Sequence, residues 1–124
     1  MDIILLTENK KQYIDLLLLA DEQESMIDRY LERGDMFVLN DNGVKAICVV
    51  ADETNGICEL KNIAVTSESQ RQGYDKRLIN YLVKHYAGKY TQMIVGTGDV
   101  PSSVSFYKRS EEHTSELQSR ITIS

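Results

Sequence analysis

The sequence has few cysteines, which limits the kinds of site it can build. It contains only two, Cys48 and Cys58. They do not form a CxxC pair, and no ligand spacing typical of zinc is present. We therefore expect no metal site, and we predict that both thiols are reduced and buried, as is usual in a cytoplasmic protein.

Long hydrophobic runs are also absent. The longest, "IDLLLLA" at residues 14–20, is far shorter than the roughly 20 apolar residues that span a bilayer. The N-terminus has neither the basic region nor the cleavage site of a secretory signal. These absences predict a cytoplasmic protein with no membrane partner.

An excess of positive charge is missing as well. The 124-residue chain has a formal net charge of -5, which disfavours binding to the phosphate backbone of nucleic acids. A local basic patch can still bind a small anion. The hydrophobic fraction of 42% and the charged fraction of 27% are close to globular averages, so one domain with one core is predicted.

The hydrophobic pattern predicts a mixed α/β fold. Apolar residues follow helical spacing over 9–34, with a break near residues 21–25, and again over 74–87. Two apolar runs flank the turn at 40–43, which contains Asn-Gly and is typical of a β-hairpin. Pro101 suits the first turn of a further helix. With strands also at 2–6, 57–65 and 92–96, the predicted order is β-α-α-β-β-β-α-β-α.

The strand at 57–65 shows a strict alternation of side chains, which assigns each residue to one face of the sheet. The unit formed by this strand, the helix at 74–87 and the strand at 92–96 is predicted to be a right-handed crossover with parallel strands. Alternation places Glu59, Lys61, Ile63 and Val65 on one face, and Cys58, Leu60, Asn62 and Ala64 on the other.

The turn between that strand and that helix contains basic residues and a glycine. A helix N-terminus exposes unpaired N–H groups and carries partial positive charge, so it attracts anions. Gly73 permits close backbone approach or a positive φ, and Gln70, Arg71 and Lys76 lie beside it. The turn therefore predicts a phosphate-binding site. The alternative is a solvated surface turn whose basic residues pair with nearby acids.

The same stretch resembles the acetyl-CoA-binding motif of the GCN5-related N-acetyltransferases, the GNAT superfamily. In that family, Gln/Arg-x-x-Gly-x-Gly/Ala follows a strand that ends in an apolar-Ala-Val-type segment. Here Ile63-Ala64-Val65 ends the strand, and Gln70, Gly73 and position 75 fill the motif. The resemblance covers residues 1–108 in the order of elements. It implies a GNAT-like mixed central sheet and acetyl-CoA as co-substrate.

The resemblance also implies which residues hold acetyl-CoA. In the family, the strand backbone pairs with the pantetheine arm and turn amides hold the pyrophosphate. The two parallel strands splay apart, and the thioester lies in the gap. The implied cofactor-binding residues are Ile63, Ala64 and Val65 on the strand, then Gln70, Arg71, Gln72, Gly73, Tyr74, Asp75 and Lys76.

Two residues match catalytic positions of the family. Direct attack of an amine on the acetyl carbonyl needs a base for the ammonium proton and an acid for the leaving thiolate. Tyr107, after the second parallel strand, is implied as the general acid, and the alternative is a packing tyrosine. Glu59 matches the general base of the histone-acetylating branch, and the alternative is a solvated strand carboxylate.

The chain departs from the family at two places. Asp75 stands where the family has Gly or Ala, and its carboxylate would repel a pyrophosphate, so weaker acetyl-CoA binding is predicted. From Arg109, "RSEEHTSELQS" resembles a translated sequencing adapter in place of the Gly-Phe and two strands that follow in the family. We therefore interpret residues 1–108 as a truncated N-acetyltransferase domain with its C-terminal strands missing, and 109–124 as a non-native tail.

The function predicted from the resemblance is transfer of an acetyl group from acetyl-CoA to a small-molecule or peptide amine by direct attack, impaired by the truncation. The alternatives are a non-catalytic acyl-CoA-binding or protein-interaction module and a plain structural α/β domain. The acceptor amine and the oligomeric state are left open. One further set of acids forms either an acidic wall for a cationic amine or solvated helix faces: Glu8, Asp21, Glu22 and Glu24.

Overall fold

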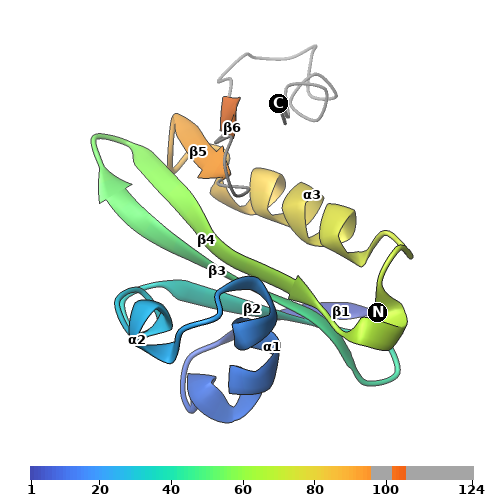
Figure 1. Ribbon diagram of the computed structural model, residues 1–124. Coiled ribbons are helices and arrows are strands. Elements are labelled where there is room, and N and C mark those ends of the chain that lie inside the picture. The colour runs from blue at the N-terminus through green and yellow to red at the C-terminus, as the bar shows by residue number, and fades with distance from the viewer. Residues whose placement is uncertain (96–101, 106–124) are drawn as a thin grey trace.

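The structure, a computed structural model, describes residues 1–95 and 102–105. Its centre is a six-stranded sheet in the order β1-β2-β3-β4-β5-β6. Figure 1 shows α3 on one side of this sheet and α1 and α2 on the other. The elements are β1 Asp2–Leu6, η1 Lys10–Tyr13, α1 Ile14–Ala20, α2 Glu24–Ile27, β2 Asp35–Asn40, β3 Val44–Thr54, β4 Ile57–Val65, η2 Ser67–Ser69, α3 Tyr74–Tyr86, β5 Gln92–Val95 and β6 Ser102–Ser105.

The predicted mixed α/β fold class is confirmed. Adjacent strands are antiparallel except β4 and β5, which are parallel on either side of α3 as predicted. The β2–β3 hairpin turns at the predicted residues, where Gly43 N donates to Asn40 Oδ1 at 3.0 Å. In the described part of the chain, no helix is long and apolar enough to cross a membrane.

The N-terminal helical region is shorter and more broken than its pattern suggests. The single turn η1 and the helices α1 and α2 account for it, and the predicted break falls between Ala20 and Glu24. Buried Lys10 holds this region together, because its Nζ donates to Leu31 O at 2.9 Å and to Gly34 O at 2.7 Å. A charged donor satisfies carbonyls that a short helical segment leaves unpaired.

Two hydrophobic clusters lie on opposite faces of the sheet. The first packs α3, through residues such as Leu82 and Tyr86, against Phe37 and Cys48. The second packs α1 and α2, through Leu17 and Ile27, against the other face. Both predicted thiols are free and buried, and burial raises the pKa of Cys58 to about 12.

The predicted side-chain alternation along β4 is wrong at Lys61. Asn62 pairs with Val49 of β3 and Leu60 pairs with Val50, so Lys61 is an extra residue, a β-bulge. A bulge shifts the later part of a strand by one residue relative to its partner. Leu60 therefore packs in the cluster under α3, whereas Ala64, which alternation places on the same face, packs in the cluster under α1.

The helix predicted from Pro101 is also wrong over Ser102–Ser105. These residues form β6, which pairs antiparallel with β5 from Val95↔Ser102 to Gln92↔Ser105. Strand pairing satisfies the backbone groups on the far side of β5, and that long-range gain outweighs the local preference that Pro101 suggests. Over Gln92–Val95, β6 therefore covers the edge of β5 that faces away from β4. Tyr107 and residues 109–124 lie outside the described residues.

Gly34 is expected to be indispensable for packing. An added Cβ would lie 2.8 Å from Val49 Cγ1 and 2.9 Å from Tyr30 O. Because the backbone cannot easily retreat, Gly34→Ala should destabilise the fold by about 3 kcal/mol in urea unfolding. Gly88→Ala is the control, since its Cβ meets nothing within 4 Å and only a φ of +94° is strained, which costs about 1 kcal/mol. Equal losses in the two variants would contradict the steric argument.

Candidate functional site

A cavity of about 500 Å³, here called the β4 cavity, opens beside the end of β4 and the start of α3. All the predicted cofactor-binding residues line it except Gln72. Two further lining residues, Leu19 and Ala20, come from the end of α1. No sequence signal links them to the turn, because the fold alone brings the end of α1 to this place. The full lining is Leu19, Ala20, Ile63, Ala64, Val65, Gln70, Arg71, Gly73, Tyr74, Asp75 and Lys76.

One edge of β4 forms a wall of the cavity and has no strand partner there among the described residues. In the described part of the chain, pairing between β4 and β5 runs as far as Leu60↔Val95, and β4 continues to Val65. The N–H of Thr66 donates to Lys45 O of β3 at 2.9 Å. Since backbone groups of successive strand residues point to opposite neighbours, those of Val65 and Ile63 point away from β3, toward this edge. Val65 O accepts from Gln70 Nε2 at 3.3 Å there.

The start of α3 forms the second wall. Gly73 precedes the helix in the left-handed conformation, with φ of 86° and ψ of 9°, and no described side chain caps the helix. An added Cβ at Gly73 would meet nothing within 4 Å, so its requirement is conformational. The first-turn N–H groups of α3 are left without intrahelical partners, and the residues that carry them line the cavity. This wall suits an anion.

Charges at the mouth of the cavity are mixed. Arg71 and Lys76 line it and add positive charge, whereas exposed Asp75 lies in the first turn of α3. Tyr74 ties this turn to the β2–β3 hairpin, because its hydroxyl donates to Asp41 Oδ2 at 2.9 Å. That hydrogen bond raises the pKa of Tyr74, so the tie persists at neutral pH. The start of α3 is therefore held by a side-chain contact outside the helix.

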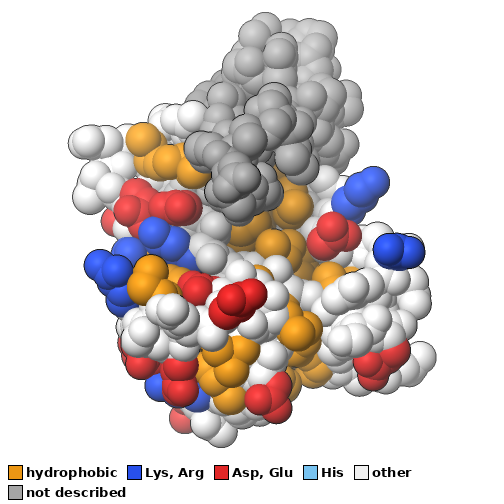
Figure 2. All heavy atoms as spheres, viewed as in Figure 1, with side chains coloured by type: hydrophobic (Ala, Val, Ile, Leu, Met, Phe, Trp, Pro, Cys, Tyr) orange, Lys and Arg blue, Asp and Glu red, His pale blue; other side chains and the backbone are white. Residues whose placement is uncertain are grey.

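A second cavity of about 540 Å³, here called the α2 cavity, lies on the other side of β4's bulge. Figure 2 shows Lys and Arg side chains gathered with Asp and Glu side chains over this part of the face, between α2 and the ends of β3 and β4. Lys61, the bulged residue, belongs to this cavity, two positions before Ile63 of the β4 cavity. The lining is Asp21, Met26, Arg29, Tyr30, Arg33 and Lys61.

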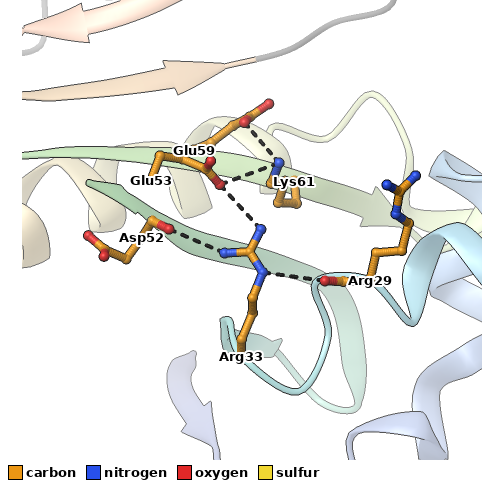
Figure 3. A network of polar contacts seen from close by, with 6 residues as sticks. All are labelled: Arg29, Arg33, Asp52, Glu53, Glu59 and Lys61. Atoms are coloured by element: carbon orange, nitrogen blue, oxygen red, sulfur yellow. Dashed lines mark hydrogen bonds and ion pairs between the residues drawn. The ribbon is translucent and has the colours of Figure 1, made fainter. Parts of the chain in front are cut away.

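An ion-pair network fixes one side of the α2 cavity (Figure 3). Lys61 Nζ lies 2.9 Å from Glu59 Oε1 and 3.4 Å from Glu53 Oε2. Arg33 reaches the same Glu53 oxygen at 3.4 Å. Its Nη1 also donates to Asp52 O at 3.2 Å, and its Nε to Arg29 O at 3.3 Å. Lys61 and Arg33 therefore hold fixed positions along β3 and β4.

Asn62 separates the two cavities and joins β4 to α1. Its Nδ2 donates to Leu17 O and to Tyr30 Oη, each at 3.0 Å, while Tyr30 donates to Asp21 Oδ2 at 3.2 Å. Burial raises the pKa of Tyr30 to about 12, so its hydroxyl is protonated at neutral pH and can donate a hydrogen bond. Asn62 Oδ1 is buried without a partner among the described residues. This polar link sets the distance between α1 and β4.

Of the two predicted catalytic residues, Glu59 lies within the described residues and Tyr107 does not. Glu59 lies on β4, half-buried, and is held by Lys61 on the side of the α2 cavity. It does not line the β4 cavity. Tyr107 lies outside the described residues. The proposed acidic wall does not form around either cavity, because only Asp21 of that set lines one and Glu24 pairs with Lys11 at 2.9 Å.

Loss of the Tyr30 hydroxyl should weaken the link between α1 and β4. Tyr30→Phe leaves one buried N–H of Asn62 without an acceptor, which should cost about 1–3 kcal/mol in urea unfolding. Tyr13→Phe, in the same hydrophobic cluster, is the matched control for removal of a tyrosine hydroxyl. If the two variants unfold at the same urea concentration, the Asn62 link contributes nothing measurable to stability.

Comparison with known proteins shows what this arrangement resembles. No protein-family model matches the chain. N-acetyltransferase YvbK of Bacillus subtilis, itself uncharacterised, is 33% identical over 73 residues, which is 58% of this chain and 47% of that protein. The chain thus spans about half the length of this relative.

Solved structures agree with that similarity. A GNAT family acetyltransferase from Elizabethkingia anophelis, with acetyl-CoA bound, superposes with a TM-score of 0.73 at 31% identity, over 79% of this chain and 65% of that one. The IAA acetyltransferase from Bacillus cereus gives a TM-score of 0.70 at 31% identity, over 79% of this chain and 67% of that one. On this identity and shared fold, the chain belongs to the GNAT family of acetyltransferases.

Proposed function

We propose that the chain is an N-acetyltransferase that moves an acetyl group from acetyl-CoA to a primary amine by direct attack. One observation carries this proposal: a single cavity combines a strand edge that has no partner among the described residues with the uncapped start of a helix. An extended amide-containing arm can add to the edge as a strand does, and a pyrophosphate suits the helix start. The E. anophelis relative, which has acetyl-CoA bound, supports the same assignment.

The lining residues fit acetyl-CoA in three of their features. The backbone groups of Ile63 and Val65 would pair with the pantetheine amides. The first-turn N–H groups of α3 would hold the pyrophosphate, with Arg71 and Lys76 adding charge. The conformation of Gly73 keeps the approach to these N–H groups clear of a side chain. Asp75 does not fit a bound pyrophosphate, since its negatively charged side chain lines the same cavity.

Acetyl-CoA supplies an activated acetyl group whose carbonyl a neutral amine attacks with loss of the CoA thiol. The residues of this chain would transfer two protons, one from the ammonium group of the acceptor and one to the leaving thiolate. We assign the base to Glu59, which would take the ammonium proton directly or through water. Lys61 holds the Glu59 carboxylate in place at 2.9 Å. Tyr107 is proposed as the acid that protonates the thiolate.

The proposal is tested by acetyl-CoA binding followed by thiol release. Calorimetric titration of the full chain should show a single acetyl-CoA site, and a panel of primary amines should release free thiol faster than the chain alone does. Binding without transfer to any amine would favour the alternative, a non-catalytic acyl-CoA-binding module. Absence of both binding and transfer would leave a structural domain and overturn the proposal.

Removal of the Asp75 charge should tighten acetyl-CoA binding. Asp75→Gly removes the carboxylate and the side chain, and Asp75→Asn removes the charge alone. We expect a dissociation constant lower by about three- to tenfold in each, because an exposed charge repels a nearby anion by about 1 kcal/mol. Glu32→Gln, at an exposed position that lines neither cavity, is a control for net charge. Unchanged affinity in both Asp75 variants would show that the pyrophosphate lies elsewhere.

Glu59 is expected to affect turnover and not acetyl-CoA affinity. Glu59→Gln should lower kcat by about a hundredfold and flatten the acid limb of the pH–rate profile, since a general base contributes at least that factor. Glu53→Gln breaks an ion pair to the same Lys61 and serves as the matched control. A similar loss in both variants would mean that the network only positions Lys61, and that Glu59 is not the base.

A further inference from the structure

The α2 cavity lies where an acceptor would have to approach. Under the proposed function, the pyrophosphate sits at the start of α3, and the pantetheine arm runs along β4 from Val65 toward Leu60. The reacting end of acetyl-CoA then lies near Lys61, roughly 13 Å along the strand from Val65. Lys61 lines the α2 cavity, and so does Asp21, which directly follows Ala20 of the β4 cavity. The two cavities thus have lining residues close together on both the strand and the helix, with Asn62 between them.

The charges that line the α2 cavity are mostly positive. Arg29, Arg33 and Lys61 face one carboxylate, Asp21, which already accepts a hydrogen bond from Tyr30. Two of these cations already form ion pairs: Arg33 pairs with Glu53, and Lys61 pairs with Glu53 and Glu59. A free primary ammonium would gain little from such a lining, whereas an anionic group would be attracted by it.

Arg29 is the cation that remains available. Among the described residues its guanidinium has no carboxylate partner, and its single side-chain contact is a weak one to Met26 Sδ at 3.8 Å. A guanidinium presents several donors in a planar fork that matches a carboxylate. Figure 3 shows the Arg29 side chain on the same side of the network as Lys61, apart from the Glu53 carboxylate that pairs with Arg33.

We infer that the acceptor is an amine that also carries a carboxylate, such as an amino acid, and that Arg29 in the α2 cavity binds this carboxylate. The volume of about 540 Å³ suits a small molecule. The carboxylate of the acceptor pairs with Arg29, its carbon skeleton lies against Met26 and Tyr30, and its amine points past Lys61 toward the reacting end of acetyl-CoA. The inference rests on the proposed function for the place of acetyl-CoA.

The test measures binding, so it does not depend on turnover. N-acetyl-L-alanine and N-acetyl-L-methionine, which stand for the products, are titrated into the full chain beside their carboxamides, with and without saturating CoA. The carboxylates should bind at least about tenfold more tightly, a difference of about 1.4 kcal/mol. Arg29→Gln should reduce this ratio to below about two. Arg29→Lys should retain part of it, because one charge remains without the fork.

A matched control and a second readout separate the possible failures. Lys84→Gln removes an exposed cation on α3 and should leave the ratio unchanged. Thiol release with L-alanine and L-alaninamide should show a KM preference for the carboxylate that Arg29→Gln abolishes. Equal affinity for acid and amide, no binding of either, or a ratio that survives Arg29→Gln would overturn the inference. If neutral amines are still acetylated in that case, the proposed function stands and only the acceptor class is wrong.

Discussion

The arrangement of the site depends on one extra residue in β4. The bulge at Lys61 lets the first half of the strand face α3 with Leu60 while the second half faces α1 with Ala64. It lies one residue after Leu60, which pairs with Val95, the last residue of β5 that the structure describes. A bulge bends a strand and increases its twist. The bend therefore reorients the part of β4 that carries Ile63 and Val65, which line the β4 cavity.

The bulge also explains why a polar residue is buried at Asn62. The shift turns its side chain toward α1 and α2, where it bonds Leu17 O and Tyr30 Oη. A buried amide oxygen without a partner is unfavourable by about 1–3 kcal/mol, and Asn62 Oδ1 has none among the described residues. An apolar residue would fill this place at no such cost. It would not, however, fix the end of α1 against β4, where both cavities have a wall.

Local sequence patterns predicted most of the fold. They failed where pairing or packing with residues distant in the sequence determines the structure. Residues close in sequence were enough to predict three features: the hairpin turn at 40–43, the apolar stripe of α3, and the parallel crossover from β4 through α3 to β5. The bulge at Lys61 could not be predicted, because buried and partly buried residues still alternate along β4. What changes after the bulge is the face of the sheet to which the buried side chains point. The strand at Ser102–Ser105 depends on the edge of β5. The β4 cavity was predictable because most of its lining is one stretch, whereas the α2 cavity joins α1 and α2 to Lys61.

The network at Lys61 imposes a condition on proton transfer under the proposed function. Glu59 is the assigned base, and a lysine ammonium lies 2.9 Å from it. That ammonium occupies one side of the carboxylate and repels a second ammonium from the same place. The amine is therefore favoured to arrive neutral, or to lose its proton through water before contact. A carboxylate on the acceptor offsets the repulsion, since an amino acid is neutral overall while its amine is still protonated. An acceptor that carries its own negative charge therefore suits both the cations of the α2 cavity and a base beside Lys61.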